Sequence, residues 1–522
     1  MKSKKSQSVF YISLVVVLGI ALWGILAPES FGVKANGVFD YLTTSFGWLY
    51  LITMFSFIIF SVYLASSKFG KIKLGPDDSK PEYSYVSWFA MLFSAGMGIG
   101  LVFWGIAEPL NHFMSSAGGD PGSAMAADFA MKKSFFHWGL HPWAGYSVIA
   151  LALAYMQFRK NKPGLISSIF IPLLGDKIVS GFVGKFIDVL AIFATVAGVA
   201  TSLGLGTLQI NSGLNYLFGV PINTFTNIVI IAVVTVLFMI SAVTGLDKGI
   251  KILSNCNLGL AGLLMILGLI IGPTLMIINA LTNGVGMYVG DIIRDSFNVE
   301  AFGDNGFVKG WTVFYWAWWI AWAPFVGVFI ARISRGRTIK EFVTGVLLVP
   351  ALGSFIWFAI FGTMGINLGT EVAAEAIKTT ETALFVVMSH YPMGSIISFV
   401  AIILLCTFFV TSADSATFVL GMMSQNGNLN PDTKRKVIWG IIQSLLALAL
   451  MLAGGLKVLQ IGSIVAAFPF IFVMIFAMVS FHKALKQDEM FQVKNYSELD
   501  ESELNMKPLS KIEQAEKKKL KS

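Results

Sequence analysis

Five of the chain's 13 tryptophans lie within twelve residues, in an apolar stretch that also holds Pro324 and Gly327. They are Trp311, Trp316, Trp318, Trp319 and Trp322. At about 100° per residue, the last three share one helix face with Phe325. Aromatic faces gathered around a helix break suit a pocket for a cation that offers no hydrogen-bond donor. The alternative interpretations are an aromatic belt at a membrane interface and ordinary helix packing.

The elements that carry these residues must lie in a membrane. Of the 522 residues, 56% are hydrophobic and only 13% are charged, whereas the surface of a soluble protein needs far more charge. We therefore expect an all-α polytopic membrane protein with about twelve transmembrane helices, because twelve apolar runs can cross about 30 Å of hydrocarbon. The runs are 9–27, 46–66, 86–106, 135–157, 184–210, 224–244, 254–282, 311–331, 342–364, 394–420, 435–455 and 459–482.

The net charge of +8 does not indicate a nucleic-acid partner. Lysine and arginine are concentrated in short loops that follow the even-numbered spans and in the tails, as the positive-inside rule requires. This asymmetry predicts a multi-pass protein of the cell membrane with both termini in the cytoplasm. The basic tail beyond Lys483 can also meet anionic membrane lipid.

Two of the expected spans are interrupted. Gly96, Gly98 and Gly100 alternate in the middle of the third span, where glycine weakens a helix and permits unusual backbone conformations. Pro324 and Gly327 interrupt the eighth span. Two broken helices in corresponding positions indicate an inverted-repeat transporter with a binding site near the midplane. Close helix packing at glycine is the alternative explanation.

Four motifs together resemble the betaine/choline/carnitine transporter family. They are AGMGIGLVFWGIAEPL (95–110), HWGLHPWAGYS (137–147), FYWAWWIAWAPFVGVFIARISRGRTIKEF (314–342) and FFVTSADSATF (408–418). The resemblance covers all twelve spans. It implies leucine-transporter-type inverted five-helix repeats, a homotrimer, and sodium- or proton-driven uptake, or exchange, of quaternary ammonium compounds. The implied divisions are 1–85 with two additional helices, 86–282 as the first repeat, 283–310 as an external interfacial helix or loop, 311–482 as the second repeat, and 483–522 as a cytoplasmic tail.

The resemblance also implies the site residues. The aromatic box that binds the ammonium head would consist of Trp138, Trp143, Tyr146 and Trp319. The unwound glycine motif of Gly96, Gly98 and Gly100 would complete the substrate site. Residues that resemble the family's permeation path toward the cytoplasm are Trp316, Trp318, Trp322 and Phe325.

The identity of residue 100 bears on the substrate. Choline-preferring relatives tend to carry an acidic residue at this position of the motif, and this chain has Gly100. Its absence favours a zwitterion such as glycine betaine, whose carboxylate can meet backbone N–H groups of the unwound helix. Carnitine, proline betaine and ectoine stay open.

The coupling ion implied by the resemblance is sodium, held between the third and tenth spans. Its ligands would come from Ser94, Met97, Phe408, Thr411 and Ser412, an oxygen-rich set that suits a hard cation. Back-bonding of Thr411 and Ser412 to the preceding helical turn is the alternative. A second sodium site would use Thr195, but the partner position one turn on is Val199, which cannot ligate.

The remaining titratable residues receive structural interpretations. We expect Glu108 to cap or pair, His137 and His141 to lack a third metal ligand, and Asp414 to be structural or a gate partner. Asp188 could pair with Arg332 or Arg335.

The function predicted from the sequence is sodium-coupled import of glycine betaine or a similar osmolyte by alternating access in a bacterial cell membrane. The rivals are a proton-coupled choline or carnitine carrier, a channel, and a membrane enzyme. A channel would need a continuous polar pore or a carbonyl filter.

Overall fold

The computed structural model describes residues 6–96, 98–244, 247–303 and 305–488, and every named element in them is helical. Ten of these helices are long and apolar enough to span a membrane. The predicted all-α polytopic fold is therefore confirmed. The ten are α1 (Ser6–Leu26), α2 (Pro28–Ser66), α9 (Phe182–Phe218), α10 (Thr224–Thr244), α11 (Asp247–Ile271), α12 (Thr274–Phe297), α13 (Val313–Ile333), α14 (Ile339–Ile366), α17 (Gly394–Met423) and α18 (Thr433–Lys486).

The difference between ten helices and twelve predicted spans has a structural origin. The third span consists of α3 (Tyr85–Gly96) and α4 (Ile99–Phe113), and the fourth of α5 (Ala124–Trp138) and α6 (Leu140–Ala154). Each piece is too short to count as a span by itself. Conversely, α18 contains the last two predicted spans, joined by non-helical Gly454 and Gly455. The count of twelve stays a prediction.

Short elements connect the long helices. They are η1 (Lys68–Lys71), η2 (Ser116–Gly118), η3 (Tyr155–Arg159), η4 (Ile166–Phe170), α7 (Ile171–Leu174), α8 (Asp176–Val179), η5 (Val308–Thr312), α15 (Gly369–Lys378), η6 (Thr380–Thr382) and α16 (Ala383–Ser389). The segment predicted as an external helix or loop, 283–310, comprises the C-terminal part of α12, the following loop and the start of η5.

The break predicted in the third span is present at the glycine motif. Helix α3 ends at Gly96 and α4 begins at Ile99. Gly98, which precedes α4, has φ −134° and ψ −148°, well outside the helical region. The main-chain N–H groups at the start of α4 consequently point into the interruption rather than into a preceding turn.

The fourth span contains a break that the sequence analysis did not predict. Gly139 separates α5 from α6 with φ −88° and ψ −133°. A Cβ atom there would lie 2.6 Å from the carbonyl oxygen of Phe135 and 2.7 Å from the hydroxyl oxygen of Tyr288. The same Tyr288 hydroxyl accepts a hydrogen bond from the backbone N–H of Leu140 at 3.0 Å. Helix α12, which carries Tyr288, thus satisfies a donor that the break leaves free.

The interruption predicted in the eighth span is wrong, because α13 is one continuous helix through Pro324. A proline removes a single main-chain donor, and dense packing around this almost entirely buried helix compensates. Gly327 serves close packing instead. A Cβ atom at Gly327 would lie 2.6 Å from Cγ2 of Ile149 on α6.

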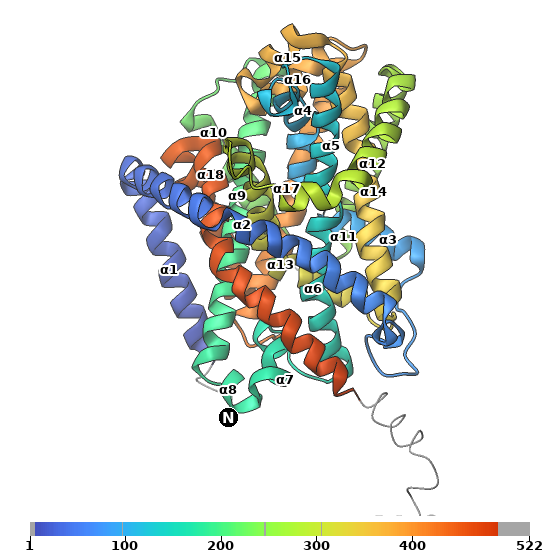
Figure 1. Cartoon of the computed structure of the whole chain (residues 1–522). Helices are drawn as coiled ribbons and strands as arrows, with labels where there is room; N and C mark the ends of the chain where they lie inside the picture. Colours follow the sequence, from blue (N-terminus) through green and yellow to red (C-terminus); the bar gives the residue numbers. More distant parts are fainter. Residues whose placement is uncertain (1–5, 97, 245–246, 304, 489–522) are drawn as a thin grey trace, which may run out of the picture.

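Helix α13 lies inside the bundle, and α2 crosses in front of it in the view of Figure 1. It packs against α6, α9 and α18. The first described helix begins, and α18 ends, at the same end of the molecule, next to α7 and α8 (Figure 1), while α15 and α16 lie at the other end. This arrangement fits an even number of crossings. The cytoplasmic location of both termini stays a prediction.

Candidate functional site

The structure brings together the four aromatic side chains predicted to form a box. Trp138 ends α5, Trp143 and Tyr146 lie on α6, and Trp319 lies on α13. The ring of Trp319 is 4.8 Å from that of Trp138 and 6.2 Å from that of Tyr146, in both cases edge to face. Trp143 meets Tyr146 at 5.6 Å. All four side chains are between 1% and 6% exposed, so the box is occluded from solvent.

Hydrogen bonds hold two of the four rings in place, and the polar group of a third ring has no hydrogen-bond partner among the described residues. The indole N–H of Trp138 donates to Oε2 of Glu108 at 2.8 Å, and that of Trp319 donates to the carbonyl oxygen of His137 at 3.0 Å. The buried hydroxyl of Tyr146 finds no hydrogen-bond partner among the described residues. An unpartnered hydroxyl on a ring that contacts two indoles is suited to a ligand that combines an apolar cationic head with an acceptor group.

The glycine motif lies directly against the box. A Cβ atom at Gly100 would lie 2.4 Å from Cη2 of Trp318 and 3.2 Å from Cη2 of Trp138. Position 100 therefore has no room for a side chain, and the backbone of α4 reaches the rings. A Cβ atom at Gly98 would lie 3.7 Å from Oγ of Ser412 on α17. The motif thus joins the aromatic rings to the predicted ion site. The side-chain surroundings of Gly96 lie outside what the structure describes.

Three of the four predicted permeation residues extend from the box along α13. Trp318 stacks on Trp319 with ring centroids 5.1 Å apart, and its indole N–H donates to Oγ of Ser202 at 3.2 Å. Further along, Trp322 and Phe325 are in edge contact at 5.4 Å. Trp316 faces elsewhere, because its ring stacks on the imidazole of His141 at 4.8 Å.

A small cavity of about 70 Å³ lies beside the predicted sodium ligands. Its wall combines four hydroxyl side chains, three aromatic side chains and one valine. These residues are Ser254, Trp322, Phe325, Val326, Phe329, Thr411, Ser412 and Ser415. Four hydroxyl oxygens around one cavity provide donors of the kind that a hard cation prefers. Phe408 is buried on α17, the helix that also carries Thr411 and Ser412. Met97 and the side chain of Ser94 lie outside the described residues.

The hydroxyl of Thr411 is already engaged with the protein. It is 3.0 Å from the carbonyl oxygen of Thr407, so the back-bonding alternative occurs in this structure. It also accepts a hydrogen bond from Nδ2 of Asn257 at 3.2 Å. Asn257 is 1% exposed on α11 and was missed in the sequence. The sequence offers no signal that singles it out, because Ser254 and Asn255 are polar neighbours on the same span.

Thr195, the ligand predicted for a second sodium site, is buried on α9, and its hydroxyl donates to the carbonyl oxygen of Ala191 at 2.8 Å. Val199 is buried one turn further on and offers no side-chain oxygen. A second ion at this position stays a prediction.

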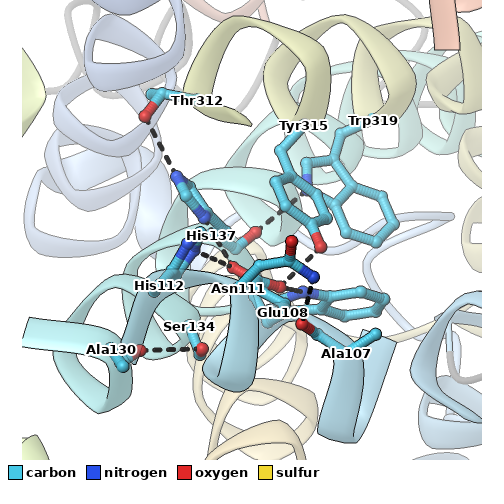
Figure 2. Close-up of polar contacts among 11 residues, drawn as sticks. Ala107, Glu108, Asn111, His112, Ala130, Ser134, His137, Thr312, Tyr315 and Trp319 are labelled. Atoms are coloured by element: carbon cyan, nitrogen blue, oxygen red, sulfur yellow. Dashed lines mark hydrogen bonds and ion pairs between the residues drawn. The ribbon is translucent and has the colours of Figure 1, made fainter. Parts of the chain in front are cut away.

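A polar cluster centred on Glu108 lies beside the box (Figure 2). Oε1 of Glu108 is 2.7 Å from Nδ1 of His137 and 3.2 Å from Nε2 of His112. Oε2 accepts from Trp138 and from the hydroxyl of Tyr315. All five side chains are at most 2% exposed. The expectation that Glu108 pairs is confirmed, with four partners from three helices.

This cluster has the composition of a metal site but the geometry of a hydrogen-bond network. The facing atoms of Glu108, His112 and His137 lie within 4.8 Å of one another. Each of them already has a hydrogen-bond partner in the cluster, and Glu108 has two further donors in Trp138 and Tyr315. The sequence analysis did not consider His112, which follows Glu108 by one helical turn. His141 lies apart and contacts Oγ of Ser296 at 2.8 Å.

The suggested pairing of Asp188 with Arg332 or Arg335 is wrong. Asp188 accepts hydrogen bonds from the backbone N–H of Ser167 at 3.0 Å and from its hydroxyl at 2.8 Å. Arg335 instead pairs with Glu82 at 3.3 Å. Asp414 accepts from Oγ of Ser241 at 3.2 Å, which joins α17 to α10.

An occluded aromatic site between the divided third and fourth spans and the continuous helix α13 of a membrane bundle is the arrangement of a transporter. Its family follows from a sequence profile described as betaine/carnitine/choline family transporter, which matches residues 8–490. The chain belongs to the betaine/carnitine/choline transporter family.

Similar proteins cover nearly the whole chain. It is 50% identical over 501 residues to the glycine betaine transporter OpuD of Bacillus subtilis. The aligned region covers 95% of this chain and 98% of that protein. It is 44% identical over 494 residues to an ectoine/hydroxyectoine transporter of Virgibacillus pantothenticus, covering 94% and 98%. A glycine betaine transporter of Acinetobacter baylyi is 42% identical over 92% of this chain and 73% of its own length.

Proposed function

We propose that this protein is a sodium-coupled symporter that imports glycine betaine, or a similar quaternary ammonium osmolyte, by alternating access. The observation that carries this proposal is the occluded box of Trp138, Trp143, Tyr146 and Trp319. The names of the relatives that are 50% and 44% identical support an osmolyte substrate.

The box suits a trimethylammonium head for a physical reason. Such a head is a large, weakly hydrated cation without N–H donors, so aromatic faces replace its water better than polar groups do. Each ring contact contributes about 0.5–2 kcal/mol, depending on desolvation. An acidic side chain in the same place would also attract inorganic cations, and position 100 offers none.

The carboxylate of a betaine would be held at the start of α4. The break at Gly98 leaves N–H groups of that helix without intrahelical acceptors, and the helix dipole favours an anion there. The open hydroxyl of Tyr146 is a further donor beside the box. A zwitterion therefore finds a partner for each of its charges.

Coupling to sodium would act through the glycine motif. An ion held by Thr411 and Ser412 would stabilise the interrupted backbone at Gly98, which lies next to Ser412. The same motif carries Gly100, where Trp318 and Trp138 of the aromatic region leave no room for a Cβ atom. Ion and substrate thus favour the same arrangement of α4. Such cooperativity is what allows an ion gradient to drive uptake.

In the cell, the proposal is a multi-pass transporter of a bacterial plasma membrane. Both termini would be cytoplasmic, lipid would surround the bundle, and three copies would assemble as a homotrimer. These features follow from the charge asymmetry and the family resemblance rather than from contacts in the structure.

Uptake into proteoliposomes tests the proposed function. Labelled glycine betaine, ectoine, choline and carnitine are offered with an inward sodium gradient, with a proton gradient alone, and with neither. The proposal predicts saturable accumulation of glycine betaine above its external concentration only when sodium is present. Accumulation in sodium-free buffer at acid external pH would instead identify a proton-coupled carrier. Non-saturable flux that only dissipates a gradient would identify a channel.

A further inference from the structure

Glu108 occupies a position that neither the predicted substrate contacts nor the predicted ion site explains. Its side chain is 0% exposed on α4, and both of its carboxylate oxygens have two partners each. A buried carboxylate is costly unless it is fully hydrogen-bonded. This degree of satisfaction therefore points to a specific task for the group.

The cluster reaches two of the four rings of the box. Glu108 accepts directly from the indole N–H of Trp138 at 2.8 Å. It also contacts Nδ1 of His137 at 2.7 Å, and the carbonyl oxygen of His137 accepts from the indole of Trp319 at 3.0 Å. Figure 2 shows Glu108 between the imidazoles on one side and the aromatic rings on the other.

The orientation of His137 is fixed at its other ring nitrogen as well. Nε2 of His137 is 3.0 Å from the hydroxyl of Thr312, which precedes α13. The ring of Tyr315, itself a donor to Glu108, stacks on His137 at 4.7 Å and lies over Trp319 at 6.2 Å. The carboxylate on α4 thus connects α5 and α13 at the point where these two helices supply Trp138 and Trp319 to the box.

We propose that Glu108 is a positioning residue that sets the affinity of the aromatic box for a quaternary ammonium head. This inference rests on the proposed function of the box. A cation–π contact requires a ring face directed at the cation within about 6 Å of the ring centroid. An indole N–H that loses its acceptor in a buried site turns toward another one, and the ring face turns with it.

Two substitutions of Glu108 separate this role from packing. Glu108→Gln keeps the shape and one acceptor oxygen but removes the charge, and charge-assisted hydrogen bonds are about twice as strong as neutral ones. Glu108→Met fills a similar volume without any acceptor for Trp138. Asn111→Ala, one turn along the same helix, is the control, because among the described residues the Asn111 amide bonds to the carbonyl oxygen of Ala107 at 2.7 Å, away from Trp138.

The measurements are KM and maximal rate of glycine betaine uptake, normalised to the amount of folded protein in the membrane. We expect KM to rise about threefold in Glu108→Gln and about tenfold or more in Glu108→Met, the latter corresponding to about 1.4 kcal/mol. The maximal rate per folded protein and the KM of Asn111→Ala stay within about twofold, since neither depends on the acceptor for Trp138.

A wild-type KM in folded Glu108→Met overturns the inference, as does a lower yield with an unchanged KM. Where Glu108→Met does not fold, Glu108→Gln decides: a KM equal to that of Asn111→Ala then contradicts the positioning role. A Trp319→Leu variant distinguishes failure of the box as the binding site from failure of the positioning role of Glu108. An unchanged KM in Trp319→Leu refutes the box itself, whereas a raised KM there with a wild-type KM in both Glu108 variants refutes only the role of Glu108.

Discussion

At the scale of single residues, the hydroxyl of Thr411 has hydrogen-bond partners in the protein and still keeps a free acceptor site. It is within hydrogen-bond distance of the carbonyl of Thr407 at 3.0 Å and of the amide of Asn257 at 3.2 Å. A hydroxyl has one donor and two acceptor lone pairs. One lone pair therefore stays available to a cation in the adjoining cavity. Back-bonding and ion ligation are compatible at this position.

An isosteric pair of substitutions tests this reading of Thr411. Thr411→Val removes the oxygen while keeping the shape, and we expect the sodium concentration for half-maximal uptake to rise about tenfold, a loss of about 1.4 kcal/mol of ion binding. Thr407→Val is the matched control, because Thr407 lies one turn away and donates to the carbonyl of Ile403 at 2.9 Å. An unchanged sodium dependence in Thr411→Val would remove Thr411 from the ion site.

Three of the four box residues share one local motif that the sequence displays, whereas the residues that support the box and the predicted ion site contact them across long stretches of sequence. The sequence places Trp138 and Tyr146 eight positions apart, within one motif. Glu108 meets Tyr315 across 207 positions, and Asn257 meets Thr411 across 154. Contacts of this kind depend on how helices pack, and no periodicity in either segment reveals them.

At the scale of helices, the approach of α4 to α13 depends on the missing side chain at Gly100. The Cη2 atom of Trp318 would lie 2.4 Å from a Cβ atom at this position, well inside van der Waals contact. Either the ring or the helix has to move to admit even a methyl group.

Gly100→Ala is therefore expected to disturb both packing and substrate binding. Overpacking of this kind costs about 1–3 kcal/mol, so the thermal midpoint of the purified protein should fall and the KM for glycine betaine should rise. Gly19→Ala is the control, because a Cβ atom at Gly19 on α1 meets nothing within 4 Å. A Gly100→Ala protein with wild-type midpoint and KM would show that α4 does not need this close approach.

Helix interruptions were predicted with mixed success, and the reasons are physical. The three alternating glycines weaken a helix by themselves, and the break lies there. Pro324 removes one backbone hydrogen-bond donor from α13. The helix stays continuous because its other backbone hydrogen bonds and its packing against neighbouring helices remain. At the Gly139 break, the hydroxyl of Tyr288 accepts from the backbone N–H of Leu140, a contact across 148 positions that the local sequence does not reveal.

At the scale of the whole molecule, hydropathy and charge predicted the class and the approximate positions of the long helices. They could not reveal that the fourth span is divided into two helices at Gly139, because that division depends on backbone geometry that apolar composition does not encode. The non-helical Gly454 and Gly455 lie at the predicted end of the eleventh span, where the sequence also separates the last two spans. The divided third and fourth spans are also the ones that bring glycine backbone and Trp138 to the site.

Binding of a quaternary ammonium head by the aromatic box is the step on which the proposed transport depends. The most direct measurement is the equilibrium dissociation constant of glycine betaine, at saturating sodium, for purified wild-type protein and for Trp319→Leu. Trp439→Leu is the matched control, because Trp439 is also buried and its indole N–H donates to Oγ of Ser424 at 3.0 Å, away from the box.

Loss of one ring contact of about 0.5–2 kcal/mol predicts a dissociation constant that rises between about twofold and thirtyfold in Trp319→Leu. The value for Trp439→Leu should stay at that of the wild type. A folded Trp319→Leu protein that binds glycine betaine as tightly as the wild type would contradict the account.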